Sequence, residues 1–307
     1  MTASSETQHP TAQIPISIGA LTASPMAWGM WRFRGDDVRA ARARVEAALE
    51  AGFTLLDTAD IYGPDNGEPF GAAEALLGRV LAEAPHLRDR MVLASKGGIE
   101  IGSPYNSSPE YLTGAVEASL RRMGVERIDV YQIHRPDTLT HPAEVAGTLA
   151  RLREAGKIGE VGLSNHTAAQ VAALQAHLPF PLAAVQIEFS PLVVEPLYDG
   201  TLDQAQALGL AVLAWSPLAQ GRLGDSLTAD ARAEAVRAAL DRVAERAGVG
   251  RTAVAYAWLM GHPARVIPIV GSQQVERIRE AAVAMDVRLS RAEWYEVLTA
   301  ARGAPLP

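Results

Sequence analysis

Short apolar runs alternate with longer amphipathic stretches along most of the chain. The apolar runs cover residues 26–29, 54–60, 91–95, 128–134, 158–164, 183–188, 211–216 and 266–271. These runs are too short for typical helices, and they are too apolar on both faces for a half-exposed sheet. Strands of a parallel sheet, which are covered on both faces, show this pattern.

The stretches between these runs have helical spacing. Leu112, Val116, Leu120 and Met123 fall on one face of one such stretch. Proline in the first turn and Thr167 as a cap mark helix starts, and glycines mark the ends. The end positions are Gly52, Gly124, Gly156 and Gly209. The pattern therefore predicts a regular alternation of strands and helices.

A closed barrel and a doubly wound open sheet both fit this alternation. A dinucleotide-binding open sheet should carry G-x-G-x-x-G after its first strand, and the chain has no such motif. We therefore predict an α/β fold with a single (β/α)8 TIM barrel over residues 14–307. Residues 16–24 are expected to form a short N-terminal hairpin below the barrel, residues 290–307 an extra C-terminal helix and tail, and residues 1–13 a disordered segment.

Composition narrows the class of protein. The chain has 307 residues, a net charge of -7 and no cysteine. There is no concentrated basic face for nucleic acid, no thiol for disulfides or catalysis, and no apolar run long enough for a membrane span. The polar N-terminus lacks the features of a signal peptide. We expect a cytoplasmic protein that binds neither nucleic acid nor membrane.

Polar residues stand at the carboxyl ends of successive predicted strands, where barrel enzymes carry their chemistry. Asp57, Lys96 and His134 each end a strand, and Tyr62 follows Asp57 by five residues. An ammonium beside a phenol lowers its pKa, a carboxylate keeps the ammonium charged, and a neutral imidazole can bind a substrate oxygen. Alone, each residue also has a structural explanation, as a turn, cap or packing residue. Their joint placement on adjacent strands favours proton transfer.

Seven separated motifs resemble those of the aldo-keto reductase family, in the same order and over the chain from about Ile14. They are DTADIYG, LASKGG, IHRPD, GKIGEVGLSN, VQIEFSP, LAWSPLAQGRL and IPIVGSQQVERI. HRPD and PIVGSQQVERIRE are most similar to the bacterial YdhF-like oxidoreductases. The resemblance implies a (β/α)8 barrel, a monomer or weak oligomer, and NADPH-dependent reduction of aldehydes or ketones to alcohols. It also implies Tyr62 as proton donor, Lys96 paired with Asp57 to lower the Tyr62 pKa, and His134 as the group that orients the carbonyl.

The same resemblance implies a set of NADP-binding residues. Ser164, Asn165 and Gln186 would bind the nicotinamide carboxamide, and Trp215 would stack on the ring. The pyrophosphate would meet Ser216, Pro217, Leu218, Gly221 and Arg222, and the ribose side would meet Gly29 and Met30. The 2′-phosphate would meet Gly271, Ser272, Gln273 and Arg277, where small residues that open a helix supply backbone N–H groups.

Two departures from the family pattern concern the adenosine end. Many relatives have Lys or an extra Arg where this chain has Ile269, Gln273 and Gln274. An Asn that often contacts adenine is replaced by Ala281, with Glu276 and Glu280 as nearby polar residues. Trp31 is a candidate for the substrate pocket, with packing at the barrel mouth as the alternative.

Two other classes of function stay open from the sequence. Voltage-gated potassium channel β subunits resemble aldo-keto reductases yet act as regulatory partners. A non-redox TIM-barrel enzyme, either a metal-dependent hydrolase or a Schiff-base aldolase using Lys96, is the second. Against metal chemistry, the seven His residues are scattered without an H-x-H pair, so no metal is expected.

Overall fold

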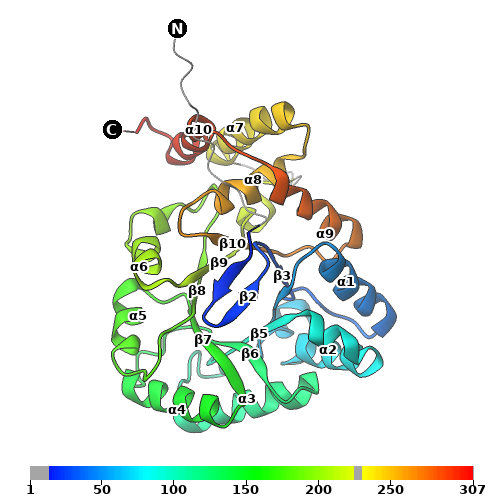
Figure 1. Ribbon diagram of the computed structural model, residues 1–307, viewed down its shortest axis with the longest axis vertical. Coiled ribbons are helices and arrows are strands. Elements are labelled where there is room, and N and C mark those ends of the chain that lie inside the picture. Colours follow the sequence, from blue (N-terminus) through cyan, green and yellow to red (C-terminus); the bar gives the residue numbers. More distant parts are fainter. Residues whose placement is uncertain (1–13, 225–229, 307) are drawn as a thin grey trace.

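The computed structural model describes residues 14–224 and 230–306, and its centre is a closed barrel of parallel strands. Around the barrel the order is β10-β3-β4-β5-β6-β7-β8-β9 (Figure 1). The strands are β3 (Ala27–Gly29), β4 (Leu55–Asp57), β5 (Val92–Gly97), β6 (Ile128–Ile133), β7 (Ile158–Ser164), β8 (Ala184–Glu188), β9 (Ala211–Trp215) and β10 (Val266–Val270). Each lies within or beside a predicted apolar run, so the predicted barrel is confirmed. The expected disorder of residues 1–13 lies outside the described residues.

Helices surround the barrel and connect its strands. They are α1 (Val38–Glu50), α2 (Ala72–Glu83), α3 (Pro109–Met123), α4 (Pro142–Glu154), α5 (Ala168–Gln175), α6 (Thr201–Leu208), α8 (Arg251–Met260) and α9 (Val275–Ala281). Short 3-10 helices lie in the connections: η1 (Pro64–Asn66), η2 (Pro85–Arg90), η3 (Glu195–Leu197), η4 (Ala219–Gly221) and η5 (Ala282–Asp286).

Local sequence sets the helix ends as predicted. The Thr167 side chain accepts a hydrogen bond from the Gln170 backbone N–H, and the Gln170 side chain accepts one from the Thr167 N–H, which forms a capping box. Gly124 ends α3 in the left-handed region with φ 65°, where glycine has no Cβ penalty. Gly52 and Gly156 also have positive φ, but they lie one residue beyond the caps of α1 and α4.

An antiparallel hairpin, β1 (Ile16–Ile18) and β2 (Leu21–Ala23), lies across one end of the barrel (Figure 1). Ile16, Ile18 and Ala23 are buried and pack with the barrel-lining Leu55 and Ile267. The predicted N-terminal hairpin is therefore confirmed, and it covers the apolar interior at the end where the strands begin.

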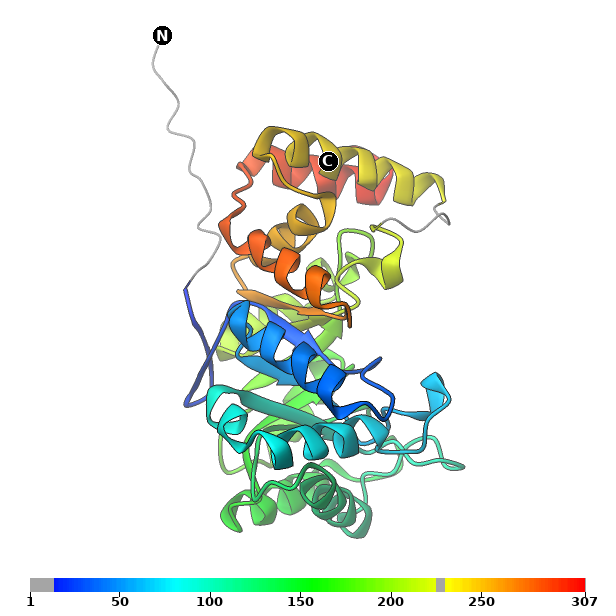
Figure 2. The same ribbon diagram turned by 90° about the vertical axis from the view of Figure 1, so that its right-hand side faces the viewer.

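Two helices lie outside the strand–helix repeat and pack on each other, as Figure 2 shows: α7 (Ala231–Ala247) and α10 (Arg291–Arg302). The C-terminal helix was predicted, whereas α7 was predicted as an ordinary member of the repeat. α10 is attached to α8 through Trp294 and Trp258, whose rings stack with centroids 4.7 Å apart. Each indole N–H donates to the other residue's backbone carbonyl, at 3.0 and 2.9 Å.

Among the described residues, none of the helices is both long enough and apolar enough to cross a bilayer.

Replacing Trp294 by Ala should lower the free energy of unfolding by about 2–4 kcal/mol, because the change removes a stacked ring and the hydrogen bond that the Trp294 indole donates to Trp258 O. Trp294→Phe keeps a ring and should cost about 1–2 kcal/mol. Urea unfolding followed by circular dichroism measures both. Equal stability of the Ala variant and the unmodified protein would show that this contact does not hold α10.

Candidate active site

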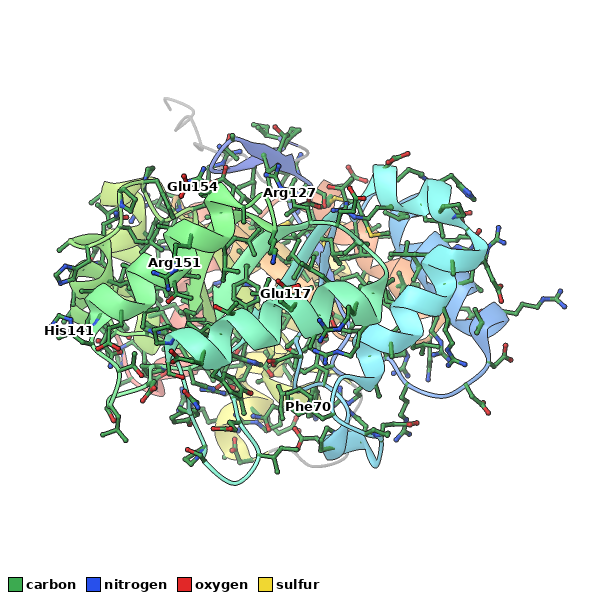
Figure 3. All side chains as sticks on the ribbon, turned by 90° about the horizontal axis from the view of Figure 1, so that it is seen from below. Phe70, Glu117, Arg127, His141, Arg151 and Glu154 are labelled. Atoms are coloured by element: carbon green, nitrogen blue, oxygen red, sulfur yellow. The ribbon has the colours of Figure 1, made fainter. Side chains whose placement is uncertain are left out.

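Four of the predicted side chains meet at the carboxyl end of the barrel, opposite the hairpin. The register sets them side by side, since Asp57 of β4 pairs with Ala94 of β5, and Lys96 of β5 pairs with Gln132 of β6. His134 follows β6 directly, and its N–H donates to Gly97 O at 2.8 Å. The two ends of the barrel are seen in Figure 3, where Arg127 lies on the hairpin side and Phe70 on the opposite side.

The ammonium of Lys96 is the centre of this cluster. Its Nζ lies 2.7 Å from Asp57 Oδ2, 2.8 Å from Thr58 O and 3.2 Å from the Tyr62 hydroxyl. Lys96 is fully buried and Asp57 nearly so. An unpaired charge in this position would be very costly, so each partner depends on the other.

The protonation states suit proton donation by a neutral phenol. Burial raises the pKa of Tyr62 above its usual value, and the opposing effect of Lys96 does not cancel it. Burial also disfavours the charge on Lys96, but Asp57 and Tyr62 outweigh it and raise the Lys96 pKa. For His134, burial and then Lys96 and Arg135 hold the pKa well below its usual value, so the imidazole is neutral.

The expected direction of the Tyr62 pKa therefore needs correction. The sequence indicated a lowered pKa, because a neighbouring ammonium favours a phenolate. Lys96 does act in that direction, but the loss of water around the partly enclosed phenol is the larger effect. The sequence gives the charge partner of Tyr62, whereas the extent of its desolvation follows from the packing.

Two glutamine side chains complete the interactions of Asp57. Gln186 Nε2 donates to Asp57 Oδ1 at 2.9 Å, and Gln132 Nε2 does so at 3.5 Å. Gln186 was expected to bind a carboxamide, and here it belongs to the ionic cluster. Gln132 was missed, although it lies two residues before His134 and therefore on the same, inward face of β6.

Asn165 joins the carboxyl ends of β6, β7 and β9. Its Nδ2 donates to Ser164 Oγ at 2.8 Å and to His134 O at 3.2 Å, while its Oδ1 accepts from Trp215 Nε1 at 2.9 Å. Asn165 has φ 60°, a left-handed conformation that Asn tolerates better than most residues. The structure therefore brings Ser164, Asn165 and the partly exposed Trp215 together beside the Lys96 cluster.

The residues expected at a pyrophosphate form the turn after β9. Ser216, Ala219 and Gln220 all have positive φ, and so does Gly221. Among the predicted residues of this turn, Pro217 is buried, whereas Ser216, Leu218, Gly221 and Arg222 are half-exposed. Arg222 makes two long contacts, from Nη1 to Asp230 Oδ2 and from Nε to Ala219 O, each at 3.4 Å.

The loop after β10 is anchored to β3. Gln273 Nε2 donates to Gly29 O at 2.9 Å, and Trp28 Nε1 donates to Ser272 O at 2.9 Å. Gly271 and Ser272 lie at the surface, and Arg277 on α9 is exposed.

Two residues considered for the adenosine side of the cofactor, Met30 and Ala281, are buried. Met30, expected on the ribose side, is fully buried in the core. Ala281 is also buried, while Glu276 and Glu280 are exposed.

Trp31 lies at the surface with 43% of its area exposed. Its carbonyl accepts a hydrogen bond from Asn66 Nδ2 at 2.6 Å, and its Nε1 lies 3.4 Å from Asp65 Oδ2. The Arg32 guanidinium lies 4.5 Å from the centroid of its ring. This exposure agrees better with the substrate-pocket hypothesis than with packing, because a packing residue would be enclosed.

A second buried titratable cluster lies behind Lys96 and was missed. Asp60 is 1% exposed and its backbone N–H donates to Lys96 O at 3.0 Å. Within the described residues, neither Asp60 carboxyl oxygen makes a well-formed hydrogen bond, and neither does the Tyr131 hydroxyl. A Cβ on Gly97 would lie 2.2 Å from that hydroxyl and 3.1 Å from Asp60 Oδ2, so only glycine allows this approach. Burial, followed by Glu74, raises the Asp60 pKa well above its usual value.

No group of three or more His, Asp or Glu side chains suited to a metal ion is present in the part of the chain that the structure describes.

Comparisons with known proteins agree with this geometry. The model of the aldo/keto reductase family matches residues 25–301, so the chain belongs to the aldo/keto reductase family. It is 51% identical over 300 residues to a 6-dehydroglucose reductase of Novosphingobium aromaticivorans, covering 97% of this chain and 98% of that protein. It is 37% identical over 294 residues to oxidoreductase YdhF of Escherichia coli, covering 92% and 95% of the two chains.

The fold agrees with a solved structure as well. A thermostable aldo-keto reductase, crystallised with the inhibitor epalrestat, superposes with a TM-score of 0.79 at 23% identity. The match covers 93% of this chain and 98% of that one. At this identity the likeness concerns the barrel fold.

Asp60→Asn should make the protein more stable at pH 8. As pH rises, the stability of the variant should fall less than that of the unmodified protein. Because the folded pKa of Asp60 is raised, the folded state keeps a proton that the unfolded state releases above about pH 4. The destabilisation caused by the buried Asp60 therefore grows as pH rises above about 4, and it is absent below that pH. Thermal unfolding from pH 4 to pH 8 tests this, with Asp89→Asn, an exposed carboxylate, as the matched control. Parallel pH curves for the Asp60 variant and the unmodified protein would contradict the prediction.

Proposed function

We propose that this protein reduces aldehydes or ketones to alcohols with NADPH and that Tyr62 donates the proton. The observation that carries the proposal is the hydrogen bond of 3.2 Å between the Tyr62 hydroxyl and a Lys96 ammonium that is itself bound to Asp57. A regulatory subunit would not need a buried ion pair beside a neutral phenol and a neutral imidazole.

The protein groups act on the developing charge of the carbonyl oxygen. When a carbonyl becomes an alkoxide, its oxygen needs a proton, and the neutral Tyr62 hydroxyl supplies it. Lys96, held charged by Asp57, stabilises the phenolate that is left. The neutral His134 ring lies against Tyr62 with centroids 5.9 Å apart, and it can hydrogen-bond the same oxygen. Its Nδ1 has no partner in the described chain.

The residues at the barrel mouth fit a nicotinamide cofactor, which when bound supplies the hydride. Asn165 holds the half-exposed Trp215 indole through its N–H, so that one aromatic group is fixed beside the Lys96 cluster. The buried Gln273 Oε1 lacks a hydrogen-bond partner in the described residues. The turn after β9 and the loop after β10 lie at the same end of the barrel, and Gly271 in the loop after β10 is exposed.

Preference for NADPH over NADH is assigned to the region around Arg277. This arginine is exposed, and none of the described carboxylates pairs with it. A guanidinium can bind a phosphate through two parallel hydrogen bonds. Surface loop residues Gly271 and Ser272 lie just before α9, on which Arg277 stands.

For the substrate class we propose a sugar-like aldehyde. The support comes from two relatives named 6-dehydroglucose reductase, at 51% identity in N. aromaticivorans and 38% in Agrobacterium fabrum. In both cases the alignment covers more than nine-tenths of each chain, so the barrel mouth is included.

Tyr62→Phe should lower kcat for aldehyde reduction by about 10²–10⁴-fold, because the change removes the proton donor and leaves the ring. The affinity for NADPH should change little. Stopped-flow kinetics with D-glyceraldehyde and NADPH binding by tryptophan fluorescence test both statements, with the exposed Tyr198→Phe as control. Full turnover in the Tyr62 variant would refute its role as proton donor.

Arg277→Met should weaken NADPH binding by about 10–100-fold, because charge-assisted hydrogen bonds to the 2′-phosphate are lost. NADH binding should stay within a factor of two or three. Titrations followed by tryptophan fluorescence measure both affinities. The matched control is Arg279→Met, since Arg279 lies on the same helix but pairs with Glu50 at 3.0 Å. Equal loss of both cofactors would show that Arg277 does not read the phosphate.

A further inference from the structure

Arg135 stands at the open end of the barrel, where the described residues show no hydrogen bond between its side chain and the proton-transfer cluster. It follows His134 directly after the end of β6 and is half-buried. The backbone on its amino side is held firmly, since His134 N donates to Gly97 O and His134 O accepts from Asn165 Nδ2. The position of Arg135 relative to His134 is therefore fixed by the strand.

The guanidinium of Arg135 lies within electrostatic reach of Tyr62 and His134. Its charge acts on Tyr62 of the β4–α2 connection, on His134, and on Glu188 at the end of β8. Most other half-buried arginines hold a carboxylate or a backbone carbonyl, as Arg88 and Arg122 do. Arg135 makes no hydrogen bond or ion pair in the described part of the chain. A half-buried guanidinium with all its donors unused has the properties of a binding group.

We propose that Arg135 determines substrate specificity by donating hydrogen bonds to hydroxyl oxygens next to the reacting carbonyl. The inference rests on the proposed function and adds to it the residue that recognises the substrate. Its planar fork of N–H donors can bind two neighbouring oxygens of a polyhydroxylated aldehyde. An unsubstituted aldehyde of the same length offers no such oxygens.

The surroundings favour hydroxyl groups over an anionic substrate group. Glu188 lies within electrostatic reach of Arg135 and offsets part of its charge. Asp65 borders the mouth beside Trp31. A phosphate or carboxylate brought there would meet these acidic groups as well as Arg135, whereas a neutral hydroxyl group would not be repelled.

The test compares two three-carbon aldehydes that differ in their hydroxyl groups, D-glyceraldehyde and propanal. In Arg135→Met the ratio of kcat/KM for glyceraldehyde to that for propanal should fall about 10–100-fold, mostly through KM for glyceraldehyde. Arg135→Lys, which keeps the charge and loses the fork, should restore part of the ratio. Arg39→Met, on the exposed face of α1, is the matched control and should keep the ratio.

The outcomes separate this inference from the proposed function. If both aldehydes lose the same factor, Arg135 acts through Tyr62 or His134 and the inference is overturned. An unchanged ratio with unchanged rates overturns it as well, while the proposed function stands. If the unmodified protein reduces neither aldehyde with NADPH, the proposed function fails and the inference fails with it. NADPH titration verifies that each variant is folded, and Arg135→Lys carries the comparison if the Met variant is not.

Discussion

The buried ion pair between Lys96 and Asp57 is the constraint on which the site depends. Neither charge could stay buried at the end of the barrel alone, because moving an unpaired ion from water into the protein interior costs several kcal/mol. The pair forms because β4 and β5 are neighbours in a parallel barrel, so that their carboxyl ends coincide. Gln186 and Gln132 donate to the other Asp57 oxygen and hold it in place. Removing β4 or β5 from this register would leave a buried charge without its partner.

The same lack of water sets the protonation of the groups around the pair. His134 is neutral and Tyr62 keeps its proton, since burial acts against the imidazolium and the phenolate alike. Lys96 stays charged because Asp57 outweighs the burial. One enclosed space therefore holds a fixed cation beside two neutral groups that can donate hydrogen bonds. Charge that develops on a substrate oxygen would meet groups already in place, which lowers the reorganisation needed.

The barrel and the four central side chains could be predicted from the sequence because both follow from local patterns. Runs that are apolar on both faces identify the strands, and polar residues at their ends identify the mouth. The partner of Gln186, the inward turn of the Met30 side chain and the net pKa of Tyr62 could not be predicted. Each depends on contacts between distant segments, such as the 129 positions between Gln186 and Asp57. Asp60 was missed for a related reason, since a motif shows that an acid is present but not how deeply it is buried.

The hairpin and the C-terminal ends of the strands divide the barrel into a closed end and a chemical end. Ile16 and Ile18 cover the interior on one side, so any molecule that binds at the cluster must approach it from the other. There the last strand residues are fixed by the hydrogen bonds between neighbouring strands, whereas the residues that follow are not held by these bonds. Arg135 stands at this boundary: its backbone is held through His134, while its side chain is unpaired in the described chain. Under the proposed function, a binding group at a fixed offset from His134 selects a substrate by the groups beside its carbonyl, and a change of that one side chain alters selection without disturbing the ion pair.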